Sequence, residues 1–66
     1  MKINVIESRL KLKNMTKDDL AEKIGLSSSA IYRKLKGTSQ FRLDEVSKIA
    51  DVLGFTKKQT YDIFFN

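Results

Sequence analysis

Residues 16–37, TKDDLAEKIGLSSSAIYRKLKG, constrain the fold more than any other stretch, because they specify two short helices joined by a tight turn. Thr16 is placed to cap the first helix, and the two aspartates that follow suit a positively polarised first turn. Gly25 ends this helix, since the residue just past a last turn commonly needs positive φ. Ser27 is placed to cap the second helix, which Gly37 closes.

Apolar residues give each of these helices one inward face. In the first helix, Leu20, Ala21 and Ile24 share a side. In the second helix, Ile31 and Leu35 recur at i and i+4. The small side chain of Ala21 lets the second helix cross closely, and Ile31 fills the angle between the two helices. The spacing of these caps, turns and apolar positions is that of a helix-turn-helix.

These residues resemble the Cro/CI-type phage-repressor family, also called the lambda-repressor-like or XRE-type DNA-binding domains. The resemblance extends to residues 43–55, LDEVSKIADVLGF, which are similar to the helix that follows the recognition helix in this family. It implies an all-α fold, a compact five-helix bundle in which residues 1–66 form a single DNA-binding domain with the motif at about 16–37. A complete Cro-like protein and the DNA-binding part of a longer repressor both fit this pattern.

Capping and periodicity signals place the remaining helices. Residues 1–14 are expected to form a helix capped by Asn4, with Glu7 completing a capping box. A further helix is expected over residues 43–53, and the T-x-x-Q pattern of residues 56–59 begins a fifth. The apolar residues expected to face the core from the first and fourth helices are Val5, Ile6, Leu10, Leu12, Leu43, Val46, Ile49, Ala50 and Leu53.

Composition narrows the function classes. The chain has no histidine and no cysteine, which removes the usual general base and the usual zinc ligands. Its paired carboxylates lie in predicted first turns and have no third catalytic group beside them. We therefore expect no enzyme activity, no catalytic residue, no metal and no cofactor. No apolar run approaches the roughly 20 residues of a membrane span, so we expect a cytoplasmic, nucleoid-associated protein of a bacterium or a phage-infected host.

The positive charge is unevenly distributed. Lys and Arg number 13 against 8 Asp and Glu, a net charge of +5. Eight of these cations fall in two segments that contain no acid, residues 9–17 and 27–43, which would flank one surface. Charge alone fits a nucleic acid, an anionic membrane or a solvated basic face. The motif between the two segments favours double-stranded DNA as the partner.

A polar stripe on residues 28–36 lies opposite the two apolar residues of that helix. The resemblance implies that this recognition helix enters the major groove and contacts base edges through Ser28, Ser29, Tyr32 and Arg33. Arg33 suits guanine, because a guanidinium can bond O6 and N7 together. The phosphate contacts expected from the resemblance and from side-chain chemistry come from Lys17, Ser27, Lys36, Thr38, Ser39, Gln40 and Arg42.

The sequence departs from the family pattern at two places. Many members pair an arginine of the first helix with an acid of the recognition helix, and Leu35 stands at that acid's position. We therefore expect Arg9 to face water or phosphate. Many relatives have proline where this chain has Phe41, which we expect to turn toward the core.

Three of the six aromatic residues lie among the last six positions, as Tyr61, Phe64 and Phe65. They form a candidate dimer surface, with core packing as the alternative. One recognition helix reads only about four to five base pairs, so the family's solution of a homodimer on a palindromic operator is expected, at least on DNA. The competing hypothesis is a protein-interaction module on the same fold, such as an antirepressor or antitoxin-like protein, with a repressor or polymerase as its partner.

Overall fold

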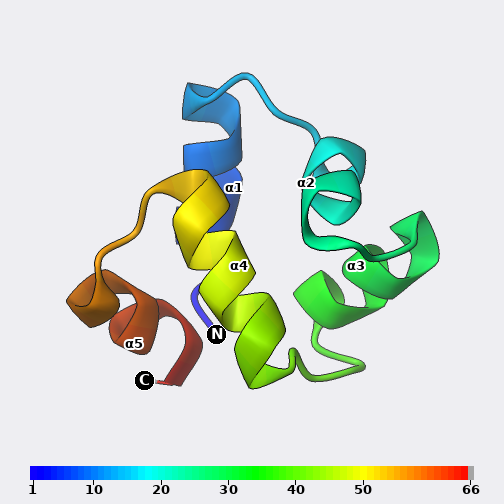
Figure 1. The fold of residues 1–66 in the computed structure, drawn as a ribbon. Helices are drawn as coiled ribbons and strands as arrows, with labels where there is room; N and C mark the ends of the chain where they lie inside the picture. Colours follow the sequence, from blue (N-terminus) through cyan, green and yellow to red (C-terminus); the bar gives the residue numbers. More distant parts are fainter. Residues whose placement is uncertain (66) are drawn as a thin grey trace.

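The computed structural model describes residues 1–65, and over those residues it contains five α-helices and no strand (Figure 1). The helices are α1 (Ile3–Leu12), α2 (Lys17–Ile24), α3 (Ser28–Lys36), α4 (Leu43–Leu53) and α5 (Lys57–Phe65). The Cα radius of gyration is 10.6 Å, close to the roughly 11 Å of a compact chain of this length. The predicted all-α, five-helix fold is confirmed.

The helices pack around α4. This helix contacts α2 on one side and α5 on the other, while α3 packs on α2 and α1 packs on α5 (Figure 1). The two ends of the fold are joined, because the backbone N–H of Lys2 donates to the carbonyl of Ile63 at 2.7 Å. Every helix within residues 1–65 is too short or too polar to cross a lipid bilayer.

The core receives side chains from all five helices. Its buried members are Ile6, Leu10, Leu20, Ala21, Ile24, Ile31, Leu35, Ile49, Leu53, Phe55 and Ile63. Three residues predicted to face this core are instead exposed, namely Val5, Leu12 and Leu43. Val5 and Leu12 lie off the face of α1 that the buried Ile6 and Leu10 define, because each residue turns a helix by about 100°. Leu43 begins α4, before the first buried residue of that helix.

The predicted helix ends of the motif are confirmed. Gly25 and Gly37 have φ of 79° and 95°, the left-handed region in which a Cβ is strained. The amide after each glycine donates back into the helix, Leu26 to the carbonyl of Ala21 at 2.9 Å and Thr38 to that of Arg33 at 3.0 Å. This closes each helix with the 6→1 bond of a Schellman motif.

The predicted cap at Thr16 and the predicted capping box at residues 56–59 are also confirmed, and Thr16 forms a full capping box with Asp19. Thr16 Oγ1 accepts a bond from the Asp19 amide at 3.0 Å, and Asp19 Oδ2 accepts one from the Thr16 amide at 2.9 Å. The hydrogen bond from the Thr16 amide is the main cause that lowers the pKa of the Asp19 carboxyl. Thr56 and Gln59 exchange the equivalent pair of bonds at the start of α5. Two helix starts are thus set by local sequence.

The predicted start of α1 was wrong. The helix begins at Ile3, with Lys2 as its cap residue, and Asn4 lies inside it. The tie between the Lys2 backbone and Ile63 fixes this start, so no side-chain cap is needed there. Glu7 forms no capping box and instead pairs with Lys17, their charged atoms 3.2 Å apart.

Arg9 also differs from expectation. Its Nη1 donates to the carbonyl of Leu53 at 2.6 Å and to that of Gly54 at 3.4 Å, and its guanidinium lies 4.6 Å from the ring centroid of Phe55. The last carbonyls of a helix lack intrahelical partners and carry partial negative charge. Arg9 therefore binds the C-terminal end of α4 instead of lying free at the surface.

The two leucines that begin and end α4 test this core assignment. Leu53 is 0% exposed and Leu43 is 75% exposed. We expect Leu53→Ala to lower the free energy of unfolding by about 2–5 kcal/mol, because it leaves a cavity. The matched Leu43→Ala should change it by about 0.5 kcal/mol or less. Urea unfolding followed by circular dichroism measures both, and equal losses would contradict the assignment.

Candidate nucleic-acid interface

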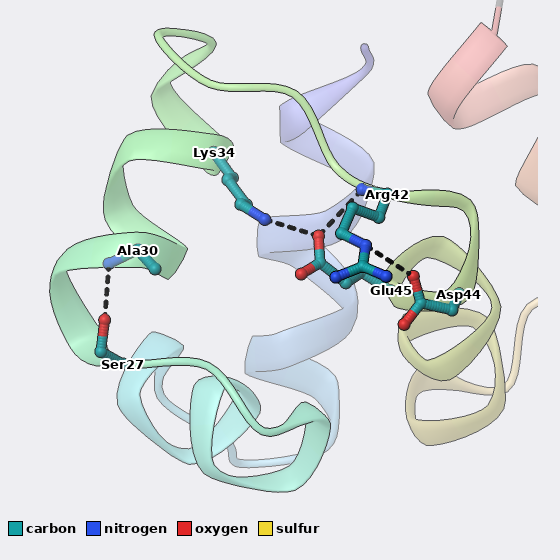
Figure 2. A network of polar contacts seen from close by, with 6 residues as sticks. All are labelled: Ser27, Ala30, Lys34, Arg42, Asp44 and Glu45. Atoms are coloured by element: carbon teal, nitrogen blue, oxygen red, sulfur yellow. Dashed lines mark hydrogen bonds and ion pairs between the residues drawn. The ribbon is translucent and has the colours of Figure 1, made fainter.

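Helix α3 is held in one orientation by its inward residues and its cap. Ile31 and Leu35 are buried in the core. Ser27 Oγ accepts a hydrogen bond from the amide of Ala30 at 3.1 Å, which fixes the start of the helix (Figure 2). Since the helix is anchored along one side and at its first turn, the opposite side is presented to solvent.

The opposite side carries the predicted polar stripe. Ser28, Ser29, Tyr32, Arg33 and Lys36 are all exposed. Within residues 1–65, the guanidinium of Arg33 makes no ion pair or hydrogen bond with another side chain. The structure therefore brings these five side chains together on one face of α3, as their spacing indicated.

A buried ion pair joins α3 to the start of α4. Lys34 Nζ lies 2.6 Å from Glu45 Oε1, with side chains 14% and 8% exposed. The same oxygen accepts the backbone N–H of Arg42 at 2.8 Å (Figure 2). Burial raises the pKa of Glu45, but the bonds from Lys34 and Arg42 outweigh it, so the pKa lies below its ordinary value. One carboxylate thus fixes both ends of the loop between α3 and α4.

The sequence did not reveal this pair. The charge pattern places Lys34 in an acid-free basic segment, and the periodicity places Glu45 in the first turn of the next helix. The sequence does carry one local signal: Glu45 stands three residues after Arg42, as an N3 acid does in a capping box. This spacing predicts a bond to the Arg42 backbone only. Nothing local connects Glu45 to Lys34 in the preceding helix.

The loop after α3 packs inward through Phe41, as predicted. The ring of Phe41 meets that of Phe64 edge to face, with centroids 5.8 Å apart. Lys34 Nζ lies 6.0 Å from the Phe41 centroid. The loop is therefore tied to α3 and to α5 as well as to α4.

The predicted phosphate contacts lie along the rim of α3 and in this loop. Ser27, Lys36, Thr38, Gln40 and Arg42 are exposed, and Ser39 is half-buried. Thr38 uses both its N–H and its hydroxyl to bond the carbonyl of Arg33, each at 3.0 Å. Arg42 Nε lies 3.3 Å from Asp44 Oδ1 (Figure 2). Thr38 and Arg42 therefore already have protein partners that a phosphate would have to share or replace.

Lys17 lies beside the polar stripe rather than apart from it. Its Nζ is 5.7 Å from the ring centroid of Tyr32 and also pairs with Glu7. A residue predicted to meet phosphate is therefore in contact with one predicted to meet bases.

Comparison with known families assigns the chain to one of them. A profile of the Cro/C1-type HTH DNA-binding domain matches residues 5–59, most of the chain. The chain belongs to this family. No curated protein and no solved structure gives a match. The resemblance seen in the sequence is confirmed, and α2, the turn at Gly25 and α3 all lie within the matched residues.

The aromatic residues of α5 divide between core and surface in this Cro/C1-type domain. Phe64 is half-buried against Phe41. Tyr61 and Phe65 are exposed, with their ring centroids 5.9 Å apart. Two of the three predicted dimer residues thus stand on the surface, and the third mainly packs inside.

The buried pair predicts a pH dependence of stability. Because the folded pKa of Glu45 is lowered, its contribution is fully present above the unfolded value near 4.5 and is lost as the pH falls through the folded value. We expect Glu45→Gln to lower the free energy of unfolding by about 1–3 kcal/mol at pH 7. This difference should shrink toward pH 3. Urea unfolding at both pH values measures it, with the exposed Glu22→Gln as control, and a loss that is equal at both would contradict the proton linkage.

Proposed function

We propose that this protein is a sequence-specific regulator of transcription, of the phage repressor or Cro-like type, that binds a palindromic double-stranded DNA operator. The observation that carries the proposal is the Cro/C1-type domain itself, with a capped α3 whose polar face is open to solvent. Helix α3 enters the major groove, and sequence is read there because each base pair presents a distinct pattern of donors and acceptors.

Base edges are read by Ser28, Ser29, Tyr32 and Arg33. Their exposure on one side of α3 supports this role, as does the absence of a side-chain partner for Arg33 within the described residues. Arg33 bonds O6 and N7 of a guanine, while the two serines either donate or accept. Tyr32 packs on a thymine methyl or a sugar.

Phosphates on both sides of the groove are held by polar groups around α3. These are Lys17, Ser27, Lys36, Thr38, Ser39, Gln40 and Arg42. Their position at the rim of α3 and in the loop that follows supports the proposal, and so does the net charge of +5. Such contacts fix the register of the protein on the duplex and make binding salt-dependent.

A homodimer, at least on DNA, completes the proposal. The exposed Tyr61 and Phe65 on α5 supply an apolar contact for a second copy, and the half-buried Phe64 adds its remaining exposed surface. Two copies place their recognition helices about 34–36 Å apart, one turn of DNA. Residues 1–66 act as one domain, and the protein works in the cytoplasm on nucleoid DNA.

Arg33→Ala is the first test. Against duplex DNA from the neighbourhood of the protein's own gene, we expect a loss of roughly 1–3 kcal/mol in binding free energy and a loss of preference over a scrambled duplex. The matched control Lys58→Ala removes one cation from exposed α5 and should affect both duplexes equally and slightly. Fluorescence anisotropy at two salt concentrations measures this, with a log–log slope of about −0.9 per neutralised phosphate expected.

The same titration tests the competing interaction module. The exposed Tyr61 and Phe65 are the observation that favours it. Equal, salt-insensitive binding of both duplexes, unchanged by Arg33→Ala combined with Ser29→Ala, would overturn the DNA-reading role. If changing Tyr61 and Phe65 to alanine then abolished the regulatory activity of the protein, the result would support a protein partner, such as a repressor or polymerase.

A further inference from the structure

Three helices meet at the ammonium group of Lys17. Its Nζ lies 3.2 Å from Glu7 Oε2 on α1 and 5.7 Å from the ring centroid of Tyr32 on α3. Lys17 itself is the first residue of α2. One cation of the helix-turn-helix is thus held between a carboxylate from outside the motif and an aromatic ring of the recognition helix.

The pair between Glu7 and Lys17 is open to solvent. Their side chains are 46% and 34% exposed. Both residues line a cleft of about 560 Å³ between α1 and the start of α2, to which Lys11 also contributes. An ion pair so placed is weak and is screened by salt, so its lysine can exchange one anion for another.

We propose that Glu7 is a positioning residue that restrains DNA binding by holding Lys17 in the free protein. This inference rests on the proposed DNA-binding function. A backbone phosphate that approaches Lys17 must take the ammonium from Glu7 or share it with that carboxylate. In either arrangement two anions lie close together, and the like-charge repulsion weakens the complex.

The exchange of Glu7 for phosphate involves only the side chain of Lys17. Lys17 begins α2, so its backbone stays beside α3 when its ammonium group, now near the Tyr32 ring, turns from one anion to another. Removing the carboxylate of Glu7 therefore frees Lys17 for phosphate and leaves the surface that reads bases intact.

The test is a double-mutant cycle on DNA affinity. Glu7→Gln should tighten binding of duplex DNA about three-fold at low salt, the size of an exposed ion pair. In a Lys17→Gln background, Glu7→Gln should raise affinity no more than Glu22→Gln does, because no ammonium remains to be released. The gain should also fade toward one-fold as salt rises, which a purely structural role of Glu7 would not produce.

Glu22→Gln is the matched control, since it removes the same charge from an exposed site on α2. Its effect on affinity should be the same in the unmodified chain and in the Lys17→Gln background. An equal gain from Glu7→Gln in both backgrounds, or weaker binding by Glu7→Gln alone, overturns the inference and leaves DNA binding standing. Failure of every variant, including the unmodified chain, to bind duplex DNA overturns the proposed function and the inference together.

Discussion

The burial of Ile31 and Leu35 fixes which side of α3 meets solvent, and the rest of the candidate interface depends on it. Residues at i and i+4 lie one above the other on a helix of 3.6 residues per turn, so two inward anchors set its rotation about its own axis. Ile31 is fully buried, while Ser29 and Arg33 stand on the opposite side. Packing in the core thus determines which side chains of α3 are exposed to a ligand, whatever that ligand is.

Local signals in the sequence predicted much of this arrangement. The caps at Thr16 and Ser27 and the turn at Gly25 depend on residues three to five positions apart, and each was found where expected. Long-range partners were not predictable in the same way. Arg9 bonds a carbonyl 44 positions away, and Lys34 bonds an acid 11 positions away. No short-range spacing in the sequence predicts either contact. Periodicity was enough to predict the candidate face of α3. The contacts that hold the loop after α3 could be found only from the three-dimensional structure.

The pair between Lys34 and Glu45 is better understood as a geometric constraint than as a source of stability. Removing two charges from water offsets much of their attraction, so buried pairs contribute little net stability even when breaking them is costly. Here the pair joins the last turn of α3 to the first turn of α4 (Figure 2). Lys34 also meets Phe41, which packs on Phe64 of α5. The loop with the candidate phosphate contacts is therefore held at a defined distance from α3.

Net charge overstates the positive charge that this surface offers to an anion. Within residues 1–65, Lys2, Lys17, Lys34 and Arg42 all have carboxylate partners, and Arg9 is bound to helix carbonyls. Of the cations on α3 itself, Arg33 and Lys36 are exposed, and Lys34 is half-buried in its ion pair with Glu45. Counterion release follows the number of phosphates actually contacted rather than the total charge of the protein. On the proposed function, affinity for DNA therefore depends on a few cations and on the acids that hold some of them in the free protein.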